Sequence, residues 1–179
     1  MKTKPSTEYA LLGALMTGPK HGYEIMQFLG TALGSIWHIG TSQLYALLRR
    51  LEGENLLCSS LETQDTRPSK RIFSLTAEGK ELFLAWLQTP TEHVRELRIE
   101  FLAKLFFLDR LSLKGGIQLI KAQTQLLEQI RKRIKQREEK EKDPFNRLVF
   151  GFKMATVEAW LQWLVKQAKP FINEVQDNG

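Results

Sequence analysis

The chain has 179 residues with a hydrophobic fraction of 42%, enough to bury one large core or two small ones. Its single cysteine excludes an internal disulfide framework and favours a reducing compartment. No apolar run reaches the roughly 18 residues of a membrane span, and the amino terminus becomes polar too quickly for a signal peptide. We therefore expect a soluble, cytoplasmic protein.

The net charge of +6 lies mostly in the second half of the chain. Residues 1–90 carry 9 Lys and Arg against 8 Asp and Glu, whereas residues 91–179 carry 17 against 12. The excess is concentrated in RKRIKQREEKEK at 131–142, which on a helix is typical of a solvated face. Net charge alone therefore does not predict DNA binding, and the placement of single cations matters more.

The chain begins with two expected helices, from about Thr7 to Met16 and from about His21 to Leu33. Gly18-Pro19 separates them. No second ligand follows His21 one helical turn later, so no metal site is predicted.

Residues 36–76 predict a short helix followed by a β-hairpin. Thr41 or Ser42 is expected to cap the helix, because a short hydroxyl side chain can accept a hydrogen bond from a first-turn amide. Gly53 and Asn55 tolerate a left-handed conformation, so they are expected to end it. The apolar positions recur every third or fourth residue and share one face: Leu44, Leu47, Leu48 and Leu51.

The hairpin is predicted from two short extended runs, LLCSSLET and KRIFSLT, joined by the polar, proline-containing QDTRPS. A further helix is expected to begin at Thr76. A helix followed by a basic-flanked hairpin is typical of a winged helix-turn-helix, in which the helix enters the major groove and the hairpin follows the backbone. The pattern alone leaves other helix-hairpin folds open.

Three segments carry a resemblance to a known family: HGYEIMQFL, then W-x-x-x-x-S-Q-L-Y-x-x-L-x-x-L-E, then RPSKRIFSLTAEGKELFLAWL. In order and spacing they resemble the PadR family of bacterial transcriptional regulators, and the helical remainder resembles its longer subfamily. The resemblance implies a mainly α fold with a small β-hairpin wing. It places a winged helix-turn-helix DNA-binding domain over residues 1–89 and a helical dimerisation and effector domain over residues 92–179. Ser42-Gln43 departs from the commonest family pattern, so an operator sequence does not carry over.

Beyond the boundary at Thr89-Pro90-Thr91, every segment is expected to be helical. A densely apolar helix is predicted from about Val94 to Leu108. Ser112 is expected to cap a long helix from Leu113 to about Lys142, and a last helix begins at Asp143-Pro144, with proline in its first turn.

The long helix carries a seam like that of a coiled coil, because Ile120, Leu127 and Ile134 recur once per heptad. Such a seam fits a dimer interface or packing against the last helix, and both are expected together. The residues assigned to dimerisation are Ile120, Leu127, Ile130, Ile134, Phe152, Trp160 and Trp163.

Base readout needs donors and acceptors near the start of a helix in the major groove, and Ser42 and Gln43 meet that requirement. Cations at the wing would contact the DNA backbone, and the resemblance places the HGY segment against phosphates. Each single residue could instead be a solvated side chain or hold the fold. The residues assigned to DNA contact are His21, Tyr23, Thr41, Ser42, Gln43, Tyr45, Arg49, Arg67, Ser69, Lys70 and Arg71.

No catalytic constellation supports an enzyme. The three histidines are scattered, and the Gly115-Gly116 pair is too little for a phosphate-binding loop, so neither enzymatic activity nor a cofactor is predicted. The resemblance implies that a small aromatic effector releases DNA. The aromatic residues Trp37, Phe101, Phe106 and Trp160 could line its pocket, although an apolar stripe is more often core.

The resulting prediction is a ligand-responsive repressor that binds double-stranded DNA as a homodimer on a pseudo-palindromic operator. The alternative is a protein-interaction module built on a winged helix that no longer binds DNA, favoured by the near-neutral charge of residues 1–90. A MarR-like arrangement of the dimer helices is a third possibility.

Overall fold

The computed structural model describes residues 6–34, 38–64 and 67–177, with the side chains of residues 63–69 and 175–177 outside that description. The chain divides into two compact units, residues 1–87 and 88–179. The division falls two residues before Thr89-Pro90-Thr91, the boundary expected from the sequence.

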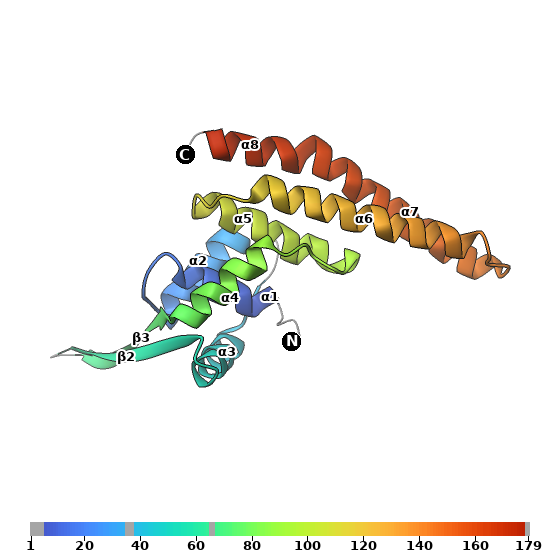
Figure 1. Ribbon diagram of the computed structural model, residues 1–179. Helices are drawn as coiled ribbons and strands as arrows, with labels where there is room; N and C mark the ends of the chain where they lie inside the picture. The colour runs from blue at the N-terminus through green and yellow to red at the C-terminus, as the bar shows by residue number, and fades with distance from the viewer. Residues whose placement is uncertain (1–5, 35–37, 65–66, 178–179) are drawn as a thin grey trace. The chain divides into compact units, whose positions relative to one another are not determined.

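The first unit combines four helices and a three-stranded antiparallel sheet of order β1-β3-β2 among its described residues (Figure 1). Strands β2 and β3 form a long ribbon that extends away from the helices of this unit, and β1 adds a two-residue edge to β3. The elements are α1 (Ser6–Leu15), β1 (Lys20–His21), α2 (Gly22–Leu33), α3 (Thr41–Gly53), β2 (Leu57–Gln64), β3 (Arg67–Leu75) and α4 (Ala77–Gln88).

The core of the first unit surrounds α1, whose residues 8–15 are all buried. A helix that is apolar on every side is stable only where other elements cover it, and α1 packs against α2, α3 and β3. Tyr9 of α1 stacks on Trp86 of α4 with the ring centroids 4.8 Å apart. The predicted apolar face of α3 lies inward at Leu44, Leu48 and Leu51, each fully buried.

The start of α3 differs from the prediction. The helix begins at Thr41 and its N-cap is Gly40, whose carbonyl accepts the first helical hydrogen bond from the Leu44 amide at 2.9 Å. The predicted cap at Thr41 or Ser42 is therefore wrong, because both residues already lie in the first turn. The predicted helix stop is confirmed at Asn55, which takes a left-handed φ of 59°.

The second unit is helical throughout its described residues (Figure 1). The helix predicted from Val94 to Leu108 is continuous from Val94 to Arg110 and passes from a 3-10 turn through a π-helical turn into an α-helix. The helix predicted to start at Asp143-Pro144 is α7, and Asp143 caps it by accepting from the Asn146 amide at 2.8 Å. The elements are η1 (Val94–Glu96), η2 (Leu97–Phe101), α5 (Leu102–Arg110), α6 (Gly116–Glu138), α7 (Pro144–Trp163), η3 (Leu164–Ala168) and α8 (Lys169–Asp177).

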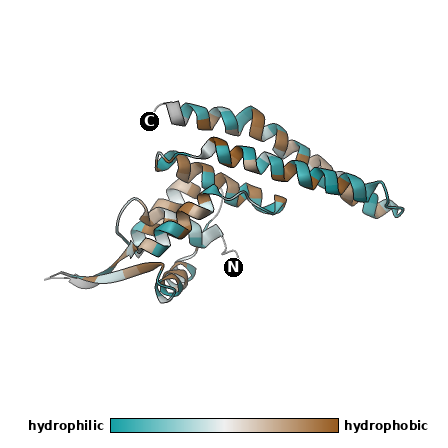
Figure 2. Ribbon diagram, in the orientation of Figure 1, coloured by the Kyte–Doolittle hydropathy of each residue, from teal (hydrophilic) through white to brown (hydrophobic). Residues whose placement is uncertain are grey.

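Helices α6 and α7 lie side by side as a long antiparallel hairpin, and α8 also packs against α6 (Figure 1). Helix α6 is mostly hydrophilic with interspersed apolar residues, as expected for a helix that buries one narrow stripe (Figure 2). The predicted heptad seam forms that stripe, because Ile120, Leu127 and Ile134 are 6%, 0% and 9% exposed.

The long helix begins at Gly116 rather than after a cap at Ser112. Ser112 instead lies in the turn after α5 with φ 48°, and its amide donates to the Asp109 carbonyl. Gly115 supplies a left-handed φ of 109° at the helix start, and a Cβ on Gly116 would lie 2.6 Å from Ile172 of α8. The glycine pair to which the sequence assigned no role therefore permits both the turn and the close helix approach.

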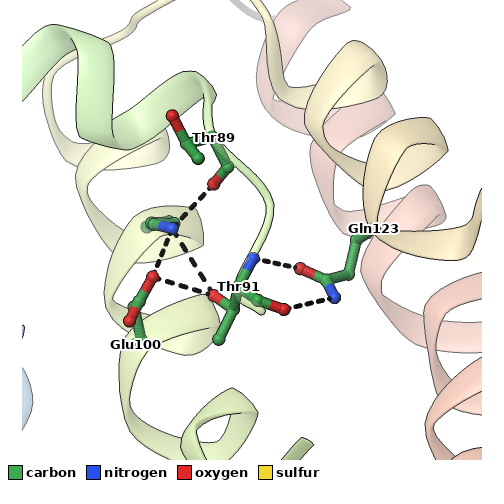
Figure 3. A network of polar contacts seen from close by, with 5 residues as sticks. Thr89, Thr91, Glu100 and Gln123 are labelled. Carbon is green, nitrogen blue, oxygen red and sulfur yellow. Dashed lines mark hydrogen bonds and ion pairs between the residues drawn. The ribbon is translucent and has the colours of Figure 1, made fainter. Parts of the chain in front are cut away.

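A buried polar network holds the segment that opens the second unit (Figure 3). Lys104 Nζ donates to the Thr89 carbonyl at 2.7 Å and to Glu100 Oε1 at 2.5 Å. Gln123 of α6 bonds the backbone of Thr91 in both directions, accepting from its amide at 2.7 Å and donating to its carbonyl at 3.0 Å. Burial lowers the pKa of Lys104 from its ordinary 10.5, while Glu100 acts in the opposite direction.

Candidate nucleic-acid interface

The face of α3 opposite its buried leucines is open to solvent. Ser42, Tyr45 and Arg49 follow one another at helical spacing on this face, and Gln43 lies beside them, all four exposed. Within the described part of the chain, the side chains of Ser42, Gln43 and Arg49 have no hydrogen bond or ion pair. A helix that buries one face and offers uncommitted polar groups on the other has the chemistry that base-edge contacts require.

The start of α2 packs against this exposed face. A Cβ on the buried Gly22 would lie 2.7 Å from Tyr45 Oη, so only glycine lets the tyrosine ring rest on the α2 backbone. Tyr45 keeps 40% of its surface exposed, and the neighbouring Tyr23 keeps 63%. The two tyrosines thus lie where α3 passes the start of α2. Tyr45 packs on the α2 backbone, and both side chains remain partly exposed.

The predicted cations divide into exposed and engaged side chains. Lys70 of β3 is exposed, as is Arg49. Arg50 of α3 pairs with the almost fully buried Glu8 of α1 and so anchors α3 to the core. The side chains of Arg67 and Ser69, assigned to the wing tip, lie outside the described residues.

Arg71 is engaged within the first unit. Its Nη2 donates to both carboxylate oxygens of Glu52, at 3.2 and 3.1 Å, and to Ser59 Oγ at 2.7 Å. Its guanidinium carbon also lies 5.7 Å from the centre of the Phe73 ring. These contacts direct the guanidinium toward α3 and β2, and the predicted role of Arg71 in DNA contact stays a prediction.

His21 is held within the first unit, and its predicted contact with phosphates stays a prediction. Its Nδ1 lies 3.1 Å from the Arg71 carbonyl and its Nε2 lies 3.2 Å from Glu62. Its backbone amide donates to Glu24 at 2.7 Å, which satisfies an amide at the start of α2. His21 therefore joins the three strands at the base of the wing. Sequence reasoning missed this because β1 is only two residues long.

The residues assigned to dimerisation fall into two groups. Ile120, Leu127 and Ile134 are buried within a single chain, and Ile130 is partly so. Phe152 of α7 is 73% exposed, and Phe145 and Leu148 of the same helix are 70% and 69% exposed.

The residues assigned to an effector pocket are spread over several environments. Phe101 is fully buried and meets the edge of Trp163 at 6.4 Å between centroids, and Trp163 meets Trp160 at 5.4 Å. Phe106 packs instead on Phe107 at 5.1 Å. Trp37 lies outside the described residues.

Two further findings concern the described residues alone. They contain no group of three or more His, Cys, Asp or Glu side chains that could hold a metal ion. Among their helices, none is both long and apolar enough to cross a membrane.

Helices α1–α3 with the ribbon β2–β3 define a winged helix-turn-helix, and this fold confirms the predicted fold class. Residues 11–85 match the model of the transcriptional regulator PadR-like family, and residues 97–169 match that of the virulence activator alpha C-terminal domain. Residues 11–85 therefore form a PadR-like family domain. That family consists of transcriptional regulators, so the prediction that the chain is not an enzyme is confirmed.

Two curated relatives are similar over part of their length. The negative transcriptional regulator PadR of Bacillus subtilis is 31% identical over 118 residues, which are 66% of this chain and 65% of that protein. A probable transcriptional regulator of Mycobacterium tuberculosis is 25% identical over 87 residues, 49% of this chain and 46% of that protein. The chain thus spans about two thirds and about half of these relatives.

A solved structure matches over nearly the whole chain. The crystal structure of Bacillus subtilis PadR in complex with operator DNA is 24% identical and covers 95% of this chain and 99% of that one, with a TM-score of 0.50. At this identity the likeness shows the fold alone.

Proposed function

We propose that this protein is a transcriptional repressor that binds DNA as a homodimer on a pseudo-palindromic operator. The observation that carries the proposal is the exposed face of α3, where the side chains of Ser42, Gln43 and Arg49 make no hydrogen bond or ion pair within the described part of the chain. Gln43 is suited to bond adenine through two hydrogen bonds, and Arg49 is suited to a phosphate. Lys70 on the ribbon supplies a further backbone contact.

The relatives support two parts of this proposal, repression and DNA binding. The Bacillus subtilis relative is a negative regulator, and the solved structure of that protein holds operator DNA. In this proposal α3 is the reading helix and β2–β3 is the wing, the roles that these elements have in a winged helix-turn-helix.

The homodimer is supported by an apolar stripe on α7. Phe145, Leu148 and Phe152 follow one another at helical spacing, and each is about 70% exposed in the single chain. Exposed aromatic side chains grouped on one face favour a protein interface, because scattered apolar residues are ordinary but grouped ones are not. A second copy offers a self-complementary partner for such a stripe.

The effector forms the last part of the proposal. The half-buried Trp160 and Trp163 lie edge to face in the second unit, and a small aromatic compound that binds beside them changes their fluorescence. Such a compound releases DNA only if it binds the DNA-free conformation more tightly. Titration with small aromatic compounds, with DNA affinity measured in parallel, tests this part.

The first experiment is fluorescence anisotropy of the full chain on the duplex upstream of its own gene, compared with a scrambled duplex of equal length across a salt series. We expect preferential binding to the upstream duplex and a steep loss of affinity with salt. Equal weak binding to both duplexes would move the operator elsewhere, and a random-sequence pool then identifies it. Absence of binding to either duplex and to the pool at low salt contradicts the proposal.

The competing function is a protein-interaction module. The near-neutral charge of residues 1–90 favours it, as do the intramolecular ion pairs of Arg50 and Arg71. Neutralising the exposed Arg49 and Lys70 together separates the two functions. The double variant loses DNA affinity if this protein is a DNA-binding regulator, and partner binding is unchanged if it is an interaction module.

A further inference from the structure

A polar cluster joins the end of α3 to the base of the wing. Glu52, the last residue but one of α3, accepts from Arg71 of β3 with both carboxylate oxygens and also from Ser59 of β2. Arg71 in turn donates to Ser59 at 2.7 Å, so the three side chains form a closed triangle. We call Glu52, Ser59 and Arg71 the wing-base triangle.

The strand register explains why the triangle can form. Ser59 faces Phe73 across the ribbon and Leu61 faces Arg71, so Ser59 and Arg71 are diagonal neighbours on one face of β2–β3. Phe73 on that face is buried, and the Arg71 guanidinium lies over its ring. The face that carries Arg71 is therefore the inner face of the wing, turned toward the helices.

The charge of Glu52 is hard to reconcile with a role for Arg71 in DNA contact. A carboxylate at the end of a reading helix repels the phosphate backbone. An Arg that contacts phosphate is held by the phosphate charge itself and does not require a neighbouring carboxylate. Glu52 is only 28% exposed and holds two donors, which is the environment of a residue that orients its neighbours.

We propose that Glu52 is a positioning residue that fixes the direction of the wing relative to α3 and touches no DNA. The proposal rests on the DNA-binding function proposed above. A reading helix and a wing must reach the groove and the adjacent backbone at the same time, and α3 and the ribbon are separate elements that follow one another along the chain through the short segment after Gly53. The wing-base triangle supplies a link between them from side chains.

The test uses the full chain and a duplex that the wild-type protein selects from a random-sequence pool. Glu52→Ala is expected to weaken binding about tenfold or more, because the wing loses its bonds to a charged group. Glu52→Gln keeps an acceptor oxygen for Arg71 and Ser59 and is expected to recover most of the affinity. Glu81→Gln, an equal charge change at an exposed acid of α4, is the control and should bind as tightly as wild type or more tightly.

Arg71→Ala separates positioning from phosphate contact. A direct phosphate contact of Arg71 lowers the salt slope of the affinity by about one in Arg71→Ala and leaves it unchanged in Glu52→Ala, whereas loss of the positioning link changes the slope of both variants alike, because the wing's phosphate contacts weaken in both. The double variant Glu52→Ala/Arg71→Ala is expected to bind no more weakly than either single variant, because both remove the same link. Tighter binding by Glu52→Ala, or a salt slope reduced in Arg71→Ala but not in Glu52→Ala, overturns the proposal.

Amide hydrogen exchange of the DNA-free chain keeps this inference separate from the function on which it rests. Glu52→Ala is expected to speed exchange about tenfold at Ser59–Leu61 and at Arg71 and Ile72, with α1 unchanged. Unchanged exchange in the ribbon overturns positioning even if DNA binding falls. If wild type selects no duplex, the regulatory function fails, and the exchange result still decides whether Glu52 holds the wing.

Discussion

At the scale of single residues, Gly79 has the least room for a Cβ among the glycines that the structure describes. A Cβ at Gly79 in α4 would lie 1.9 Å from the backbone carbonyl oxygen of Leu56 and 3.1 Å from Leu75. Because a backbone atom cannot rotate away, Gly79→Ala is expected to lower the free energy of unfolding by about 1–3 kcal/mol in urea denaturation.

The matched control for that substitution is Gly30→Ala in α2, where a Cβ meets nothing within 4 Å. Alanine in an exposed helix interior is more favourable than glycine, so Gly30→Ala should raise stability by up to about 1 kcal/mol. Equal effects of the two substitutions would contradict the close approach of α4 to Leu56.

The exposed residues of α3 are expected to separate by role. Gln43→Ala should reduce discrimination between duplexes at one base position and leave the salt slope unchanged, because a lost base contact releases no counterion. Arg49→Gln should weaken binding to all duplexes alike and lower the slope by about one. Anisotropy on selected and mismatched duplexes across a salt series measures both. Identical behaviour of the two variants would remove the distinction.

At the scale of elements, Lys104 ties α5 to the segment at Thr89–Thr91, and its titration should be visible in stability. Burial lowers its pKa below 10.5, so the unfolded chain binds more protons between the lowered pKa and 10.5. In that alkaline interval this group's contribution to stability rises with pH, and it is lost as pH falls through the lowered pKa.

The measurement compares wild type with Lys104→Met, so that titration of all other groups cancels. The free energy of unfolding of wild type minus that of the variant is expected to increase with pH between the lowered pKa of Lys104 and its ordinary 10.5. Parallel pH profiles for the two proteins would show that Lys104 does not titrate differently in the folded chain.

Elements with strong local signals were predictable from the sequence, and those set by distant contacts were not. The leucines of α3, the left-handed Asn55 and the Asp143 cap follow from residue type and spacing. Strand β1 does not, because two residues carry no periodicity and the strand exists only by pairing with β3. The start of α6 depends on the approach of Gly116 to Ile172, which local sequence cannot reveal.

The candidate site shows the same division. Exposure of Ser42, Gln43 and Arg49 follows from the buried face of α3, which the leucine pattern predicts. The commitment of Arg71 to Glu52, and of His21 to Glu62, depends on strand pairing between distant residues. Residue type alone marks a cation as available for DNA, and only its partners within the fold decide whether it is.

At the scale of the whole molecule, the two apolar stripes of the helical hairpin differ in burial: one is covered within the chain and the other is exposed. The heptad stripe of α6 is covered by α7 and α8 of the same chain, so it is filled before any second copy arrives. The stripe of α7 at Phe145, Leu148 and Phe152 is left exposed. We therefore place the proposed dimer contact on α7, and the α6 seam assigned to dimerisation acts within one chain.

The dimer contact can be tested with Phe152→Asp, at the most exposed residue of the stripe. In a two-fold dimer each substitution occurs twice, and burying a charge in place of an aromatic ring should weaken association by about 2 kcal/mol or more, roughly thirtyfold. Sedimentation velocity across a concentration series measures this. Val165→Asp is the control, since Val165 is 62% exposed but falls outside the spacing of the stripe.

DNA affinity of Phe152→Asp should fall at low protein concentration and recover at high concentration, because mass action restores the dimer. A variant that dimerises like wild type would exclude Phe152 from the contact, and one that dimerises normally yet loses DNA would point to an effect on the DNA-binding unit instead.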